Sequence, residues 1–121
     1  GLGIISKNPS ANALPIDHVL RGSDSGYGDQ FISFTRDEGF ARSWATRKGT
    51  GVASVDLDAI QNAKIDLSTA EGRMVHLGDV SKAAPKSDLH KANGWARGAK
   101  EVLVEGEIPC DKIKSYYTCR G

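Results

Sequence analysis

The chain has 121 residues and a mass of 12.9 kDa, which is enough for one compact domain and too little for two ordinary ones. Its hydrophobic content of 39% and mean hydropathy of -0.37 are usual for a soluble globular protein. No apolar run approaches the roughly 20 residues of a membrane-spanning helix. The formal net charge of +1 argues against binding to nucleic acid through bulk charge, because counterion release requires many local cations.

The amino-terminal segment lacks a clear hydrophobic period. Residues 1–15 are rich in Gly, Ser, Asn and Pro, so we expect an irregular arm or a linker remnant, followed by a single compact domain over residues 16–121. The first residue is Gly1, and the segment has neither the charged nor the apolar region of a signal peptide. We therefore expect a fragment of a longer chain.

The next third of the chain predicts two short strands and a helix. Ile16 to Leu20 is expected as the first short strand, which ends in Val19 and Leu20 before Arg21, and a Gly-rich turn over residues 22–29 can bring backbone amides close to a ligand. A second strand is expected over residues 30–34. Thr35, with Glu38 three residues on, has the pattern of a helix start, and that helix should end at residues 49–51.

The remaining elements predict an α+β domain with mainly antiparallel, twisted sheets and a few short helices. The expected strands cover residues 52–57, 101–105 and 113–119, and the expected helices lie around 70–77 and 87–98. A turn or short helix is expected at 57–60 and a turn or helical start at 109–112, and the segment at 65–68 has no assigned element.

Three segments carry side chains suited to a reaction centre. Arg21 closes the first apolar run, Ser33 lies in Phe-Ile-Ser-Phe-Thr, and Glu101 opens the strand Glu-Val-Leu-Val-Glu before a Gly-Glu-Ile-Pro turn. A guanidinium makes paired contacts to phosphate, and a fixed carboxylate stabilises positive charge that develops in a transition state.

These segments, in this order, resemble the bacterial ADP-ribosyltransferase toxins of the cholera and pertussis type. The resemblance covers residues 16–118 and implies an ADP-ribosyltransferase-like fold that uses NAD as a substrate. It implies that Arg21 supports the phosphates or ribose of NAD, that Ser33 orders the site, and that Glu101 holds the nicotinamide ribose as an oxocarbenium ion develops. Gly22, Thr35 and Phe40 are the further residues we expect to contact NAD.

The same resemblance suggests a biological setting. It implies the toxic tip of a larger bacterial effector, secreted or delivered at the cell surface, that acts in the cytoplasm of a target cell in interbacterial, contact-dependent competition. Such a tip would travel with a cognate immunity protein and would modify a protein or RNA, or hydrolyse NAD. Family members that modify arginine usually carry a second glutamate two positions before the catalytic one, where this chain has Ala99, so the acceptor stays open.

A second hypothesis is a metal-independent ribonuclease toxin that cleaves tRNA, dependent on a host elongation factor as partner. A histidine would then act as base or acid, and the three candidates are His18, His76 and His90. On a regular strand His18 would point away from Arg21. The expected phosphate contacts are Lys100, Arg21 and Thr35. The sequence around residues 82–100 is locally basic, which is usual for a solvated helix face and also suits an anionic partner.

Simpler interpretations stand beside both hypotheses. Arg21 and Glu101 can form a structural ion pair, with Ser33 as a cap, and the chain can be a binding module without chemistry. No metal is expected, because the acids and histidines do not cluster at ligand spacing. Cys110 and Cys119 can form a disulfide in an oxidising compartment or remain free thiols.

Overall fold

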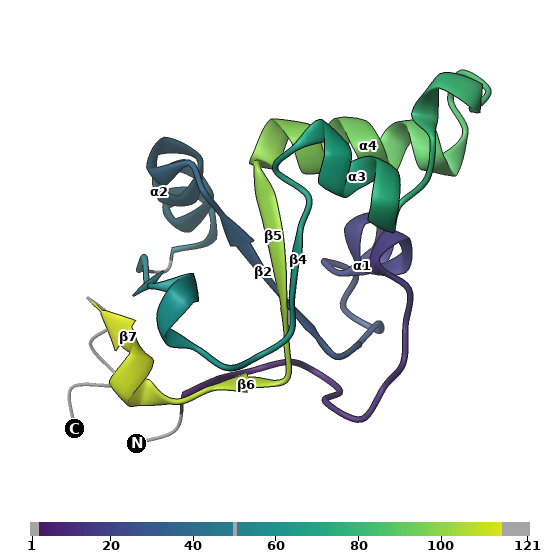
Figure 1. The fold of residues 1–121 in the computed structure, drawn as a ribbon. Coiled ribbons are helices and arrows are strands. Elements are labelled where there is room, and N and C mark those ends of the chain that lie inside the picture. Colours follow the sequence, from purple (N-terminus) through teal and green to yellow (C-terminus); the bar gives the residue numbers. More distant parts are fainter. Residues whose placement is uncertain (1–2, 50, 115–121) are drawn as a thin grey trace.

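The computed structural model describes residues 3–49 and 51–114, and within them the fold is α+β with small antiparallel sheets, as predicted (Figure 1). No helix in this part of the chain is long and apolar enough to cross a membrane. The strands are β1 (Ile4–Ile5), β2 (Phe31–Thr35), β3 (Ser54–Val55), β4 (Lys64–Asp66), β5 (Glu101–Glu105), β6 (Glu107–Ile108) and β7 (Ile113–Lys114), and the helices are α1 (Pro15–Arg21), α2 (Glu38–Lys48), α3 (Ala70–His76) and α4 (Asp88–Ala99).

Strand β5 is the centre of the molecule, because it pairs antiparallel with β2 on one side and β4 on the other. Its three middle residues, Val102, Leu103 and Val104, are almost completely buried. Leu103 belongs to a core cluster with Phe31, Leu67 and Ala96 on one face, and Val104 belongs to a second cluster on the other. A strand that is buried on both faces has a continuous apolar run, which explains the Val-Leu-Val sequence.

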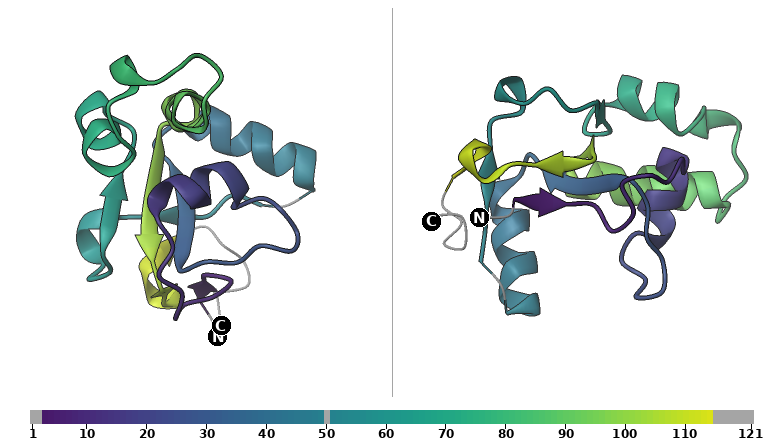
Figure 2. Two further views of the ribbon diagram at one scale, coloured as in Figure 1. Left: turned by 90° about the vertical axis from the view of Figure 1, so that its right-hand side faces the viewer. Right: turned by 90° about the horizontal axis from the view of Figure 1, so that it is seen from below.

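The helices lie on different sides of this sheet. Helices α1, α3 and α4 are grouped together and pack against one another, whereas α2 lies apart from them beside β2 (Figures 1 and 2). The two-stranded pairs β1–β6 and β3–β7 lie at the end of the molecule away from α3 and α4. One face of β2 and β5 is therefore directed to the three grouped helices.

The register of β2 and β5 decides which side chains share that face. Ser33 is opposite Leu103, and Thr35 is opposite Glu101. Directly opposed residues of an antiparallel pair point to the same face, and residues two apart along a strand do so as well. Ser33 and Glu101 are thus diagonal neighbours on the face that carries Phe31 and Leu103.

The expected strand over residues 16–20 is wrong, because these residues form helix α1. Pro15 occupies the first helical turn, where a missing N–H has no cost, Asp17 follows in the first turn, and Arg21 ends the helix. Val19 packs on the core cluster of Leu103. The apolar residues Ile16, Val19 and Leu20 have the i, i+3, i+4 spacing of a helix, and α1 packs against α4.

Two boundary predictions also need correction. The amino-terminal arm is not wholly irregular, since β1 pairs with β6 and the Gln30 side chain bonds both backbone groups of Ala13 at 3.0 and 2.9 Å. Thr35 is the last residue of β2 and does not cap a helix. Asp37 caps α2 instead, where its carboxylate accepts from the backbone N–H of Phe40 at 3.1 Å.

Most other predicted elements agree with their positions to within two residues, namely β2, β5, α3, α4, the helical turns at Leu57–Ala59 and Cys110–Lys112, and the end of α2 at Gly49. Strand β4 lies at a segment for which no element was predicted. The strand expected over 52–57 is present only as β3. The final strand begins at Ile113 as predicted, but most of it and the proposed pairing of Cys110 with Cys119 lie outside the described residues.

Leu103→Ala should destabilise the domain by about 3 kcal/mol, because it removes a fully buried side chain and leaves a cavity beside Phe31 and Leu67. Urea unfolding should show a lower midpoint with an unchanged slope. Val75→Ala is the matched control, since Val75 is 69% exposed and should change stability by less than about 0.5 kcal/mol. Equal effects of the two changes would contradict the placement of Leu103 in the core.

Candidate active site

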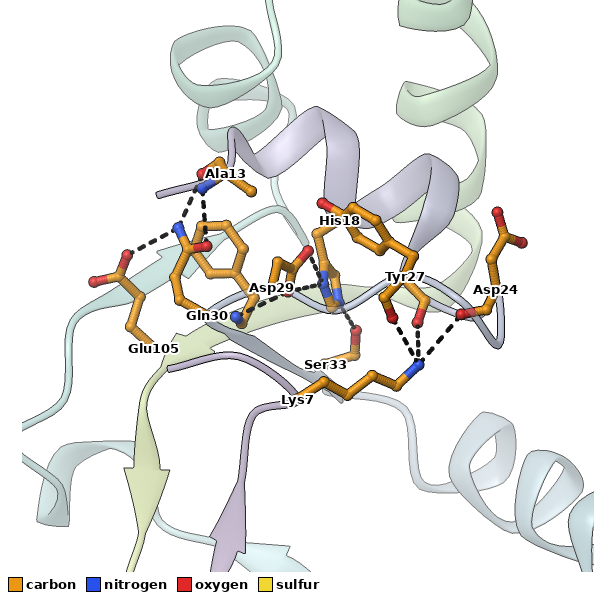
Figure 3. Close-up of polar contacts among 11 residues, drawn as sticks. Lys7, Ala13, His18, Asp24, Tyr27, Asp29, Gln30, Ser33 and Glu105 are labelled. Atoms are coloured by element: carbon orange, nitrogen blue, oxygen red, sulfur yellow. Dashed lines mark hydrogen bonds and ion pairs between the residues drawn. The ribbon is translucent and has the colours of Figure 1, made fainter. Parts of the chain in front are cut away.

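Three polar side chains from three different segments form a hydrogen-bonded line (Figure 3). His18 of α1 contacts both carboxylate oxygens of Asp29 through Nδ1, at 2.8 and 2.9 Å. Its other nitrogen, Nε2, lies 2.6 Å from the Ser33 hydroxyl on β2. His18 and Asp29 are buried, whereas Ser33 is exposed. The imidazole thus has a buried carboxylate on one side and a solvent-accessible hydroxyl on the other.

Asp29 is held firmly in this position. Its Oδ1 also accepts from the backbone N–H of Phe31 at 3.0 Å, and the residue is only 3% exposed. The ring of Tyr27 lies on the same side, with its hydroxyl oxygen buried (Figure 3). Burial, together with the neighbouring Asp29, raises the pKa of Tyr27 to about 12, so that the phenol stays protonated at neutral pH. Asp29 is therefore a fixed acceptor for His18.

The loop over residues 22–29 is shaped around His18. A Cβ on Gly22 would lie 2.6 Å from the backbone oxygen of His18 and 3.0 Å from its ring carbon Cε1, so only glycine allows this approach. The ammonium of Lys7 donates to the carbonyls of Gly22, Asp24 and Tyr27 at 3.2 to 3.4 Å, which closes the loop (Figure 3). In the structure Gly22 lets the chain pass close to His18. Its expected contact with NAD stays a prediction.

Glu101 joins the cluster through Ser33. Burial raises the pKa of the Glu101 carboxyl above its usual range, while a hydrogen bond from Ser33 and the nearby His18 act in the opposite direction. Ser33 and Glu101, which the sequence analysis placed in one site, are thus brought together. His18 and Asp29 complete the group, which we call the His18 cluster: His18, Asp29, Ser33 and Glu101.

The Ser33 hydroxyl has one proton and can donate it in one direction only. If Ser33 donates to the Glu101 carboxylate, Nε2 of His18 must donate to Ser33, and the imidazole then carries a proton on both nitrogens. If Ser33 donates to His18, Nε2 is unprotonated and acts as a base toward the hydroxyl. The cluster therefore has two hydrogen-bond states, which differ in where one proton lies between His18 and Glu101.

Arg21 lies outside the hydrogen bonds of this cluster. It is the last residue of α1, it is exposed, and its guanidinium stands 4.7 Å from the ring centre of Tyr27. Within the described residues no hydrogen bond or ion pair joins Arg21 to Ser33 or Glu101, and the proposed structural Arg21–Glu101 ion pair is absent there. A role for Arg21 toward phosphate stays a prediction.

The other residues expected to contact NAD are placed as follows. Thr35 uses its hydroxyl within the protein, where Oγ1 donates to the backbone oxygen of Ala99 and accepts from the N–H of Asp37. Phe40 is 37% exposed in the first turn of α2. Neither observation tests ligand binding. His76 and His90 are exposed, on α3 and α4, and no hydrogen bond links their rings to the His18 cluster within the described part of the chain.

An open hollow of about 430 Å³ borders the carboxyl-terminal end of β2, the strand that pairs with β5. Its lining includes Phe34, Thr35, Arg36 and Val102, so it lies beside α2 on the opposite face from Ser33. A volume of this order is typical of small-molecule sites. No group of three or more His, Cys, Asp or Glu side chains that could hold a metal occurs in residues 3–49 and 51–114.

The sequence did not identify Asp29 as a site residue, and it placed His18 on a strand, where the side chain would point away from Arg21. On a strand, His18 and Arg21 would lie on opposite faces, but on a helix residues three apart are neighbours. The pattern Pro-Ile-Asp at residues 15–17 is a helix-start signal, and it would have moved His18 to a helix. Asp29 had no such signal, because its role depends on the loop folding back onto α1.

Glu101→Gln should stabilise the fold at neutral pH. A carboxyl whose pKa is higher in the folded than in the unfolded chain contributes stability at acid pH, and this contribution is lost as the pH rises through the folded pKa. The amide does not ionise, so the gain in denaturation midpoint at pH 7 should shrink as the pH falls through the raised folded pKa and should be lost below about 4.3, the unfolded value. The exposed Glu107→Gln should show no such gain. A lower stability of Glu101→Gln at pH 7 would refute the expectation.

Comparisons with protein-family models, curated proteins and solved structures found no match to this chain.

Proposed function

We propose that this domain is an enzyme that cleaves the bond between nicotinamide and ribose in NAD and transfers ADP-ribose to a protein, an RNA or water. The observation that carries the proposal is the juxtaposition of Ser33 and Glu101 on neighbouring strands, with His18 and Asp29 behind the serine. These two residues are the serine and the glutamate that the resemblance to ADP-ribosyltransferase toxins selects.

The chemistry requires a negative charge at a fixed place. As the bond to nicotinamide breaks, the leaving group departs as neutral nicotinamide, and the ribose gains oxocarbenium character. A carboxylate held beside that carbon stabilises the transition state more than the substrate, which is the condition for acceleration. Glu101 is suited to this role because burial strengthens its electrostatic interactions. Burial also raises the pKa of its carboxyl, and the Ser33 hydrogen bond and nearby His18 act against that rise.

The diphosphate of NAD needs positive charge. Arg36 is half exposed and pairs with Asp66 at 3.1 Å, so its guanidinium retains donors for a diphosphate. Arg21 is the second candidate for this contact, in agreement with the role that the resemblance implies. In this proposal the domain is the toxic tip of a delivered effector and has an immunity protein that blocks the site.

The second candidate function is metal-independent cleavage of RNA, and a specific observation favours it. His18 Nε2 and the Glu101 carboxyl lie on either side of one serine hydroxyl, and Asp29 holds the other nitrogen of His18. Transfer of the 2′-hydroxyl proton to a base and donation of a proton to the leaving 5′-oxygen need two such groups. Arg21, one helical turn after His18, and Lys100, which precedes Glu101, are available for phosphate.

One experiment separates the two functions. The purified domain is incubated with NAD, and separately with total tRNA with and without a cytosolic extract that contains elongation factors, while nicotinamide release and RNA length are followed. Release of nicotinamide with intact tRNA is the expected result. Cleaved tRNA with intact NAD would replace the proposed function by the second candidate. Intact NAD and intact tRNA in both conditions would favour a binding module.

A further inference from the structure

We propose that Ser33 is a nucleophile and that the domain reacts with activated acyl groups, with carboxylic esters as the class of substrate. The inference concerns a second activity of the His18 cluster and does not rest on the cleavage of NAD. It depends on the order Asp29, His18, Ser33 along one line of hydrogen bonds (Figure 3).

Each member of this line has the environment that its role requires. The acid, Asp29, is buried and is fixed by the backbone N–H of Phe31. The base, His18, is held at Nδ1 by that acid, which selects the tautomer with Nε2 free to accept a proton from Ser33 at 2.6 Å. The nucleophile is the exposed member and can meet a substrate. Other exposed serines in the loop, Ser23 and Ser25, have no histidine contact within the described residues.

The backbone at Ser33 supplies a donor for the developing oxyanion. The bonds from Gly106 N to Gln30 O and from Arg36 N to Lys100 O show that the even-numbered residues of β2 face β5. The N–H of Ser33 therefore points to the other side of β2, which is the open edge of the three-stranded sheet. An N–H of the nucleophile itself is a common component of an oxyanion hole.

The reaction balances with groups present in the cluster. Ser33 Oγ bonds to the carbonyl carbon as its proton moves to His18 Nε2, and the alkoxide leaving group departs with that proton when the ester bond breaks. Water then attacks the acyl group, gives a proton to His18, and the acid is released while Ser33 regains its proton. Asp29 acts through His18 and is a positioning residue.

The test uses a fluorophosphonate probe on the native domain, with adducts located by mass spectrometry. The Ser33 Oγ–phosphorus bond forms as the phosphorus–fluorine bond breaks, and fluoride leaves. We expect an adduct on Ser33 and none on Ser23 or Ser25, and no adduct after denaturation in urea. Reaction at the three serines at equal rates, or no reaction at Ser33, would overturn the proposal.

Variants identify the groups that act. His18→Gln should slow labelling of Ser33 by about 100-fold, whereas the exposed His90→Gln should leave it unchanged. Labelling of Ser33 is measured without NAD and nicotinamide release without the probe, so that failure of this inference and failure of the NAD proposal give different results. Hydrolysis of p-nitrophenyl acetate should follow the same order. If His18→Gln does not fold, the comparison of Ser33 with Ser23 and Ser25 in the native chain still tests whether Ser33 is the nucleophile. Unchanged labelling in a folded His18→Gln variant would refute the role of His18.

Discussion

Glu101→Gln is expected to lower the rate of nicotinamide release from NAD by about 100-fold to 1000-fold, the cost of removing one group that stabilises transition-state charge. The amide has almost the same shape as the carboxylate and can keep the contact with Ser33, but it has no negative charge to offer the ribose. The loss should therefore appear in kcat, with a small change in KM.

Glu107→Gln is the matched control for this change. Glu107 is exposed on β6, only six residues further along the chain, and the same substitution there removes the same charge from the molecule without touching the His18 cluster. Its rate should equal that of the unaltered chain. A fully active Glu101→Gln variant would eliminate the NAD proposal, because that proposal requires the negative charge of this carboxylate beside the ribose.

His18→Gln is expected to reduce nicotinamide release on the order of 100-fold, because a small displacement of a positioned group has an effect of that size. In the proposed function His18 does not touch NAD. It holds Ser33 and favours the ionised form of Glu101. Loss of the nearby imidazole should raise the pKa of Glu101 further, so the acid limb of the pH–rate profile should move to higher pH.

The shift of the profile distinguishes this role from a structural one. His76→Gln, on the exposed end of α3, should change neither the rate nor the profile. A reduced rate with an unmoved acid limb would mean that His18 does not influence the ionisation of Glu101. If His18→Gln abolished tRNA cleavage while Glu101→Gln retained it, the histidine would be the main catalyst of the second candidate function.

The candidate site has two possible hydrogen-bond arrangements. Burial raises the pKa of Glu101. The Ser33 hydroxyl can donate its one proton either to His18 or to Glu101. A ligand that needs a carboxylate favours one proton arrangement, and a ligand that needs a basic imidazole favours the other. The expected stability gain of Glu101→Gln follows from the same burial, because a buried charge is retained at a cost.

Local sequence was sufficient to predict the two strands that carry Ser33 and Glu101. The continuous Val-Leu-Val run identified β5 with Glu101 at its first residue, and alternation in Phe-Ile-Ser-Phe-Thr identified β2 with Ser33 at its middle. Both patterns are strong because burial acts on every second residue, or on all of them, over a whole strand. The end of α2 at Gly49 was also readable, since its φ of 68° favours glycine.

Tertiary structure decided how the site is assembled. Residues 15–17 carry a helix-start signal that the strand prediction overlooked, and the packing of α1 against α4 then moves His18 into the site and leaves Arg21 at the surface. The pairing of Asp29 with His18 joins residues eleven apart through a loop that Lys7 closes from the amino-terminal arm. Such contacts leave no periodic trace, because each depends on single residues whose positions are set by segments distant in the sequence. The sequence by itself therefore determined strands β2 and β5, with Ser33 and Glu101 on them, and the folded chain determined which histidine and which acid meet them.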